Sequence, residues 1–238
     1  MEENVDLMFD KSCSEKIKKR LDDNNIRYFA CDNISEFISD DEKTELINEL
    51  TEKFNSVLDS LIIDRKNDPN SNGTGRRLAK MYVNEIMAGR YDTPPVITSF
   101  PNYGEHQYQG MLVVRAEINS ICSHHHQPVK GVAYIGIIPG DKVIGLSKYV
   151  RIAQWYARRG QLQEELTQQI AKSISQSTGS ESVAVYIEAT HGCMSCRGVE
   201  QNNSTTQTTV LKGQFYDSVV KREFFDNIKL QKMSKGYE

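Results

Sequence analysis

Two groups of thiol and imidazole side chains stand far apart in the C-terminal half of the chain. The first is Cys122-Ser123-His124-His125-His126, and the second is His191-Gly192-Cys193-Met194-Ser195-Cys196-Arg197. Each group follows a stretch whose apolar pattern predicts a β-strand. Thiolate and imidazole are ligands that suit zinc, and three such ligands with a fourth position left to water are typical of a catalytic site. The sequence therefore predicts a zinc centre built from two distant segments.

Other interpretations of these residues stay open. The chain has five cysteines, an odd number, and a reducing compartment favours metal binding over a disulfide framework. A disulfide between Cys193 and Cys196 is the rival reading of that pair. Cys196 alone is interpreted as a small buried thiol. Alternate side chains of a strand point to opposite faces, so the three histidines cannot all bind one ion unless the chain turns there, and His126 is interpreted as a mere neighbour.

Composition and charge limit the class of protein. The chain has 238 residues, enough for one sizeable domain or two small ones, and 38% of them are hydrophobic. No apolar run reaches the length of a membrane span, and the acidic N-terminus lacks a signal-peptide pattern, so we expect a cytoplasmic protein without a membrane partner. Residues 1–64 hold 17 acidic and 8 basic side chains, whereas the rest hold 15 and 21. A moderately basic C-terminal part suits an anionic ligand such as a nucleotide phosphate, but it is too weak for a nucleic-acid surface.

Periodicity predicts helices first and strands later. Helices are expected over about 13–24, 41–64 and 75–88, the second capped by Ser39 to Glu42, with a loop over 67–73. Strands are expected over about 107–121, 131–138, 182–189 and 205–215, with helices over 147–159 and 162–177 between the two strand pairs. This order predicts an α+β fold with an antiparallel sheet. The expected regions are a helical part and loop over 1–73, a catalytic domain over 74–225, and a polar, disordered tail over 226–238.

Five ordered blocks closely resemble type I GTP cyclohydrolase. They are Arg77-Leu78-Ala79-Lys80-Met81-Tyr82, the Cys122 to His125 block, Gly145-Leu146-Ser147-Lys148-Tyr149-Val150-Arg151-Ile152, Gln161-Leu162-Gln163-Glu164-Glu165-Leu166-Thr167, and His191 to Gly198. The resemblance implies the tunnelling fold, an antiparallel sheet backed by two helices. It also implies a toroidal homo-oligomer of pentameric rings, stacked as a decamer, with active sites between subunits. The N-terminal helices would serve either ring stacking or regulation.

The resemblance also implies a role for each matched residue. The implied zinc ligands are Cys122, His125 and Cys193, and the implied acid–base residues are His124 and His191. The implied guanine contacts are Gln163 and Glu164, and the implied triphosphate contacts are Arg77, Lys80, Lys148, Arg151 and Arg197. Ser147 matches a serine placed for a later rearrangement, although a helix N-cap would explain it equally well.

The implied reaction converts GTP and water to formate and 7,8-dihydroneopterin triphosphate, a first step toward folate, biopterin or 7-deazaguanine. Zinc would lower the pKa of a bound water that attacks C8 of guanine. Two departures stand out: the family usually has Glu at Ser123, and Thr-Pro where this chain has Thr74-Gly75. The rival functions are a non-catalytic GTP-binding regulatory homologue and a nitrile reductase of the same fold.

Overall fold

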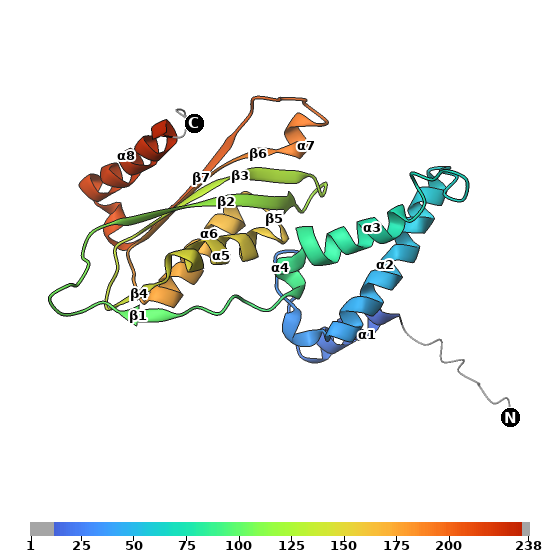
Figure 1. The fold of residues 1–238 in the computed structure, drawn as a ribbon, viewed down its shortest axis with the longest axis horizontal. Helices are drawn as coiled ribbons and strands as arrows, with labels where there is room; N and C mark the ends of the chain where they lie inside the picture. The colour runs from blue at the N-terminus through green and yellow to red at the C-terminus, as the bar shows by residue number, and fades with distance from the viewer. Residues whose placement is uncertain (1–11, 235–238) are drawn as a thin grey trace. The chain divides into compact units, whose positions relative to one another are not determined.

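The structure is a computed structural model that describes residues 12–234 and consists of two units, Met1–Thr93 and Pro94–Glu238 (Figure 1). The first unit extends past residue 73, so it includes the helix that carries Arg77 and Lys80. Among the described residues, no helix is both long and apolar enough to cross a membrane.

The first unit is helical. It contains α1 (Cys13–Asp23), a 3₁₀ turn (Ser35–Phe37), α2 (Asp40–Ser60), α3 (Thr74–Met81), a π-helical turn (Tyr82–Ile86) and α4 (Ala88–Tyr91). These elements confirm the three predicted helices, but the third is α-helical only as far as Met81. Their apolar faces share one core of buried side chains, which includes Ile17, Leu21, Ile34, Leu46, Ile47, Ala79 and Val83.

Polar contacts fix the start of α2 against α1. Ser39 and Glu42 form the predicted capping box, in which each side chain binds the backbone N–H of the other residue. Both oxygens of Glu42 also accept hydrogen bonds from Arg20 of α1, at 2.5 and 2.9 Å. The Arg20 guanidinium donates further to the Phe37 carbonyl, at 2.6 Å, so one side chain links α1, α2 and the 3₁₀ turn.

The second unit is built on a five-stranded sheet. Its strands lie in the order β5 (Gly160–Gln161), β2 (Leu112–Cys122), β3 (Pro128–Ile137), β6 (Val183–His191) and β7 (Thr206–Leu211). All neighbours are antiparallel except β5, which runs parallel to β2. Two short strands, β1 (Ser99–Pro101) and β4 (Lys142–Ile144), form a separate antiparallel pair. The predicted α+β fold with an antiparallel sheet is therefore confirmed.

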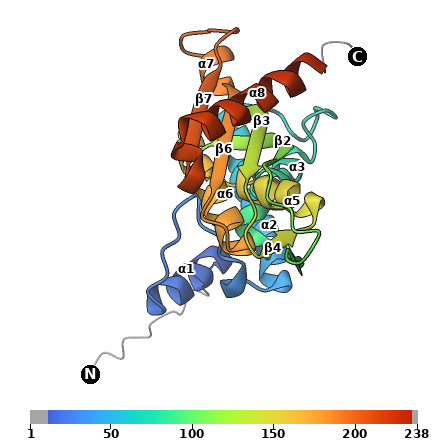
Figure 2. The ribbon, with the colours of Figure 1, turned by 90° about the vertical axis from the view of Figure 1, so that its left-hand side faces the viewer.

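Helices pack on both faces of this sheet (Figures 1 and 2). The predicted pair, α5 (Leu146–Ala157) and α6 (Gln163–Thr178), covers one face and forms the main core with alternate residues of β2, β3 and β6. On the other face, Phe224 and Ile228 of α8 (Ser218–Ser234) pack with Tyr134 and Tyr186.

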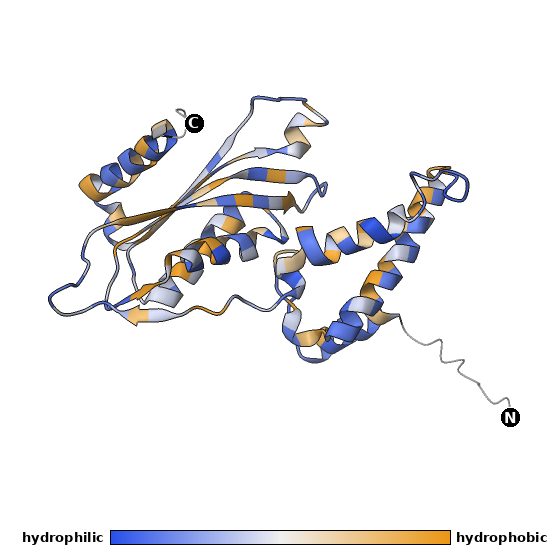
Figure 3. Cartoon of the chain, viewed as in Figure 1, coloured by the Kyte–Doolittle hydropathy of each residue, from blue (hydrophilic) through white to orange (hydrophobic). Residues whose placement is uncertain are grey.

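The helix α8 corrects the prediction of a disordered tail. Residues 218–234 form one helix on which polar and apolar segments alternate (Figure 3). Gly136 makes room for it, because a Cβ there would lie 2.7 Å from the Phe224 ring. The strand predicted over 205–215 is also shorter, since it ends at Leu211 and a 3₁₀ turn (Gly213–Tyr216) follows.

We predict that Glu42 stabilises the first unit only above acidic pH. The hydrogen bonds from Arg20 lower the pKa of Glu42 from its ordinary value to about 2. A carboxyl whose pKa is depressed by folding contributes stability above its unfolded pKa, and that contribution is lost as pH falls through the folded pKa. Urea unfolding of wild type and Glu42→Gln should show a stability difference at pH 6 that shrinks toward pH 3. A difference that stays constant over this range would contradict the assignment.

We also predict that Gly75→Ala destabilises the chain. Gly75 is buried in α3, and a Cβ there would lie 2.2 Å from Asn55 Oδ1 and 2.9 Å from the Thr51 carbonyl oxygen of α2. The overpacking cost should exceed the helix-propensity gain of alanine, for a net loss of about 1–2 kcal/mol in the free energy of unfolding. Gly140→Ala is the matched control, because its Cβ would meet nothing within 4 Å. Equal stability of the two variants would refute a steric need for glycine at position 75.

Candidate active site

The thiol and imidazole groups predicted from sequence meet at one end of the five-stranded sheet. β2 ends at Cys122, and β6 ends at His191, which pairs with Val129 near the start of β3. The parallel pairing of β5 with β2 places Gln161 opposite Cys122. The first turn of α6, which begins at Gln163, therefore starts beside the ends of β2 and β6 (Figure 1).

The side chains of Cys122 and Cys193 lie near each other. Cys122 is buried at the end of β2, and Cys193 lies in the short helix α7 (Gly192–Ser195) that follows β6. Burial raises the pKa of the Cys193 thiol, and the nearby Cys122 thiol acts in the same direction. Gly192 permits the close packing of α7 on β3, because a Cβ there would lie 3.0 Å from Pro128.

The three histidines lie in a turn rather than along a strand. The His126 N–H donates to the Cys122 carbonyl at 2.9 Å, and His126 has a left-handed φ of 51°. This turn exposes His124 and His125. The Nδ1 atom of His124 lies 3.9 Å from the Cys122 sulfur, whereas His125 lies beside His124, with 6.4 Å between the ring centroids.

His191 is hydrogen bonded to Gln163, with 2.8 Å between His191 Nε2 and Gln163 Oε1. Gln163 is only 4% exposed, and its amide nitrogen lies within hydrogen-bond distance of three protein acceptors. Burial lowers the pKa of His191, and the carboxylate charge of Glu164 acts in the opposite direction. Glu164 itself is exposed. The structure thus places the expected guanine pair in different surroundings, one side chain inside the protein and the other at its surface.

The expected phosphate contacts of the second unit lie on α5 and in the segment after α7. Lys148 and Arg151 occupy the first two turns of α5, and Arg197 follows α7, where its charge favours the thiolate form of Cys193. The Lys148 ammonium donates to the Val96 carbonyl at 2.7 Å. Ser147 is exposed and is not the N-cap of α5, since that position is Gly145, so the capping explanation for this serine is wrong.

The remaining expected phosphate contacts, Arg77 and Lys80, lie on α3 of the first unit. Both are exposed. The Arg77 guanidinium donates to the Asn70 carbonyl at 2.8 Å and to Thr74 Oγ1 at 2.9 Å, so it is tied to the loop that precedes its helix.

The donor set fits zinc in its chemistry. Two neighbouring thiols, with imidazoles in the turn that follows Cys122, are soft and borderline ligands of the kind that zinc prefers. Within residues 12–234, however, no three His, Cys, Asp or Glu side chains converge as a metal site requires. The pair Cys122 and Cys193 is the part of the predicted ligand set that the structure assembles.

Some features of the site were not predicted from sequence. Thr167 of α6 and Thr208 of β7 hydrogen bond to each other and to Gln163, and no pattern in the sequence points to them. Cys196 is exposed at the end of α7, so its interpretation as a buried thiol is wrong. All five cysteines are free thiols, and the disulfide alternative is absent from this structure.

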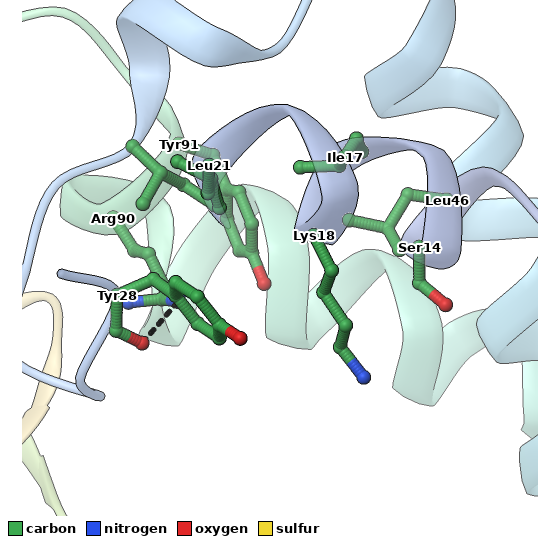
Figure 4. Close-up of a pocket in the computed structure, with 9 residues that line it drawn as sticks. Ser14, Ile17, Lys18, Leu21, Tyr28, Leu46, Arg90 and Tyr91 are labelled. Atoms are coloured by element: carbon green, nitrogen blue, oxygen red, sulfur yellow. Dashed lines mark hydrogen bonds between the residues drawn. The ribbon is translucent and has the colours of Figure 1, made fainter. Parts of the chain in front are cut away.

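A separate pocket of about 120 Å³ lies within the first unit (Figure 4). Ile17, Leu21 and Leu46 give it an apolar wall, and Lys18 lies at its side. The guanidinium of Arg90 is engaged by backbone carbonyls, including that of Tyr28 at 3.0 Å. None of the residues predicted for the active site lines this pocket.

Thiols, imidazoles and a carboxylate lie at one end of the sheet, and basic side chains lie in the same unit. This combination is typical of an acid–base enzyme that acts on an anionic substrate. Comparison with known proteins identifies the family. The family model for GTP cyclohydrolase I matches residues 50–229. The chain is 40% identical to GTP cyclohydrolase 1 of Flavobacterium johnsoniae over 195 residues, which cover 81% of this chain and 85% of that protein. It is 38% identical to the Pseudoalteromonas translucida enzyme of the same name, over 76% of this chain and 98% of that protein.

These matches show that the chain belongs to the GTP cyclohydrolase I family, so the predicted family and enzyme class are confirmed. A GTP cyclohydrolase 1 from Aeromonas salmonicida is 43% identical over 67% of this chain and 73% of that protein. Among solved structures, the apo form of the archaeosine synthase QueF-Like is similar to this chain with a TM-score of 0.37 and 14% identity, covering 43% of this chain and 93% of that one.

Proposed function

We propose that this chain is a zinc-dependent GTP cyclohydrolase that converts GTP and water to formate and 7,8-dihydroneopterin triphosphate. The observation that carries the proposal is the placement of Cys122, Cys193, His191 and Glu164 at the same end of the sheet, in a chain of this family. The product would enter folate, biopterin or 7-deazaguanine synthesis in the cytoplasm.

The proposed zinc ligands are Cys122, His125 and Cys193. The proximity of the two thiols supports their part in this set, and the resemblance supports His125. When bound, zinc supplies the activation of water for attack on C8 of the guanine ring.

The other proposed roles follow from the chemistry of each side chain. His191 and His124 move protons at guanine N7 and at the ribose ring oxygen, because imidazole titrates near neutral pH. Glu164, exposed on the first turn of α6, accepts hydrogen bonds from the guanine N1–H and exocyclic amine. Arg77, Lys80, Lys148, Arg151 and Arg197 bind the triphosphate, and Ser147 assists the later ribose rearrangement.

We also propose that the site is completed between subunits of a ring. Among the described residues, β7 has a strand neighbour on one side only, and β2 pairs with β5 only at Ile121 and Cys122. Exposed strand edges invite pairing with another chain, and closing a ring removes them. Pentameric rings, stacked as a decamer, would use these edges.

The first test is turnover. Zinc-loaded protein incubated with GTP should yield fluorescent neopterin after oxidation, and His191→Ala should lower the rate by about 10²-fold or more through loss of proton transfer. Size-exclusion chromatography of both proteins controls for assembly. A zinc-replete oligomer that binds GTP but makes no pterin would instead support a regulatory homologue, with Ser123 as the first position to restore to Glu.

The second test concerns the metal. Wild type should bind about one zinc per chain, and Cys193→Ser should lose it because a serine oxygen is a poor replacement for a thiolate ligand. Cys196→Ser is the matched control in the same CxxC segment and should keep its zinc, as measured by elemental analysis of dialysed protein. Equal zinc content in the two variants would rule out Cys193 as a ligand.

A further inference from the structure

We propose that Gln163 is a positioning residue that holds His191 in the tautomer protonated at Nε2, so that Nδ1 is the nitrogen that exchanges a proton with substrate. This inference rests on the proposed acid–base role of His191 and assigns to Gln163 a role other than guanine recognition. The buried hydrogen-bond network around the Gln163 amide carries it.

The orientation of the amide is determined by its surroundings. Its nitrogen lies 3.2 Å from the Ile187 carbonyl oxygen and 3.1 Å from the Thr206 carbonyl oxygen. Backbone carbonyls can only accept hydrogen bonds, so the NH₂ group must face them. A flipped amide would place its oxygen against two other oxygens. The Gln163 oxygen therefore faces His191.

The orientation of the amide in turn selects the proton on the imidazole. Gln163 Oε1 is an acceptor, so His191 Nε2, which lies 2.8 Å away, must donate. A neutral imidazole carries one proton, and Nδ1 is then left with a lone pair. Gln163 is 4% exposed, so its side chain is largely shielded from bulk water.

Two threonines make the same orientation self-consistent. The Thr167 hydroxyl donates its proton to the backbone carbonyl of Gln163 at 2.7 Å. In the 2.7 Å contact between Thr167 and Thr208, Thr208 must therefore be the donor. Thr208 Oγ1 is then free to accept from the Gln163 amide, at 3.1 Å. Three acceptors share the two N–H groups of the amide, and the two carbonyls among them are satisfied only when the amide nitrogen faces them.

The same contacts argue against a guanine contact by the Gln163 amide N–H groups. Both face acceptors of the protein itself, and the side chain is buried. Glu164 is the adjacent residue and is exposed, so it remains available to the substrate. The two side chains therefore predict different kinetic effects when each is removed.

The direct test is the tautomer in wild-type protein. Solid-state ¹⁵N NMR of the zinc-loaded, histidine-labelled oligomer at pH 8.5, with His191 assigned by comparison with His191→Ala, should show a neutral ring protonated at Nε2. Protonation at Nδ1, or a mixture of the two tautomers, would overturn the inference. Because this measurement is made on a protein with Gln163 intact, its result does not depend on whether the Gln163 variants fold.

The second test is a double-mutant cycle between Gln163→Leu and His191→Ala. In the wild-type background, Gln163→Leu should lower kcat by about 10²-fold, because a misplaced acid–base group costs that order of rate. In the His191→Ala background it should lower kcat no further, since residues that act as a unit are not additive. GTP affinity, measured by calorimetry in the His191→Ala background, should change by less than about threefold. Additive losses in kcat, or a large loss of GTP affinity, would show direct substrate binding instead.

Gln163→Glu provides the conservative comparison. A protonated carboxyl keeps one acceptor for His191 and one donor for a carbonyl, so it should recover at least about tenfold of the rate lost in Gln163→Leu. No recovery would count against the positioning role. The proposed function fails separately, if zinc-loaded wild type forms no pterin from GTP. The inference alone fails if wild type is active and His191→Ala is inactive while Gln163→Leu matches wild type.

Discussion

The parallel pairing of β5 with β2 is the constraint on which the site depends. Only two residue pairs form it, Ile121 with Gly160 and Cys122 with Gln161, yet they bring the start of α6 to the end of β2. The connection between α5 and α6 is reinforced locally. Arg159 is buried, with its guanidinium 3.9 Å from the Trp155 ring centroid and 4.6 Å from that of Tyr156. A two-residue strand, next to a buried arginine stacked on two aromatic rings, is thus enough to position the start of α6 beside the end of β2.

The antiparallel register of β2, β3 and β6 brings the end of β6 next to the end of β2. β3 lies between β2 and β6, so the end of β2 and the end of β6 both meet the start of β3. Gly131 lets β3 and β6 approach closely, because a Cβ there would lie 2.1 Å from the Glu188 carbonyl oxygen. A slip of one residue would turn every side chain to the opposite face, and the two hydrophobic cores oppose such a slip. The position of His191 is therefore set by packing well away from the site itself.

Periodicity predicted the fold because the decisive residues repeat at helical or strand spacing. The four-residue spacing of apolar side chains predicts α6, the apolar run of β6 predicts a strand, and Ser39 with Glu42 predicts a helix start. The helix α8 was not predicted because its largely polar sequence is ordered by packing on the sheet, where Gly136 makes room for it. Helix propensity alone does not reveal such tertiary packing. The histidine turn escaped prediction because it depends on one backbone hydrogen bond and one left-handed residue, His126. The exposed position of Cys196 likewise follows from tertiary placement.

The different surroundings of Gln163 and Glu164 follow from helix geometry. Successive residues of an α-helix are rotated by about 100°, so two adjacent residues cannot both face the sheet. On the first turn of α6, the residue facing the sheet is an uncharged amide, which can be buried because its partners are all present. The residue facing outward is a carboxylate, which is favoured near a helix N-terminus and would be costly inside. An exchange of the two side chains would place a carboxyl against two backbone carbonyls, where it must be protonated to avoid burying a charge, and would leave an uncharged amide at the exposed position. The site therefore favours an amide at the buried position 163 and a carboxylate at the exposed position 164.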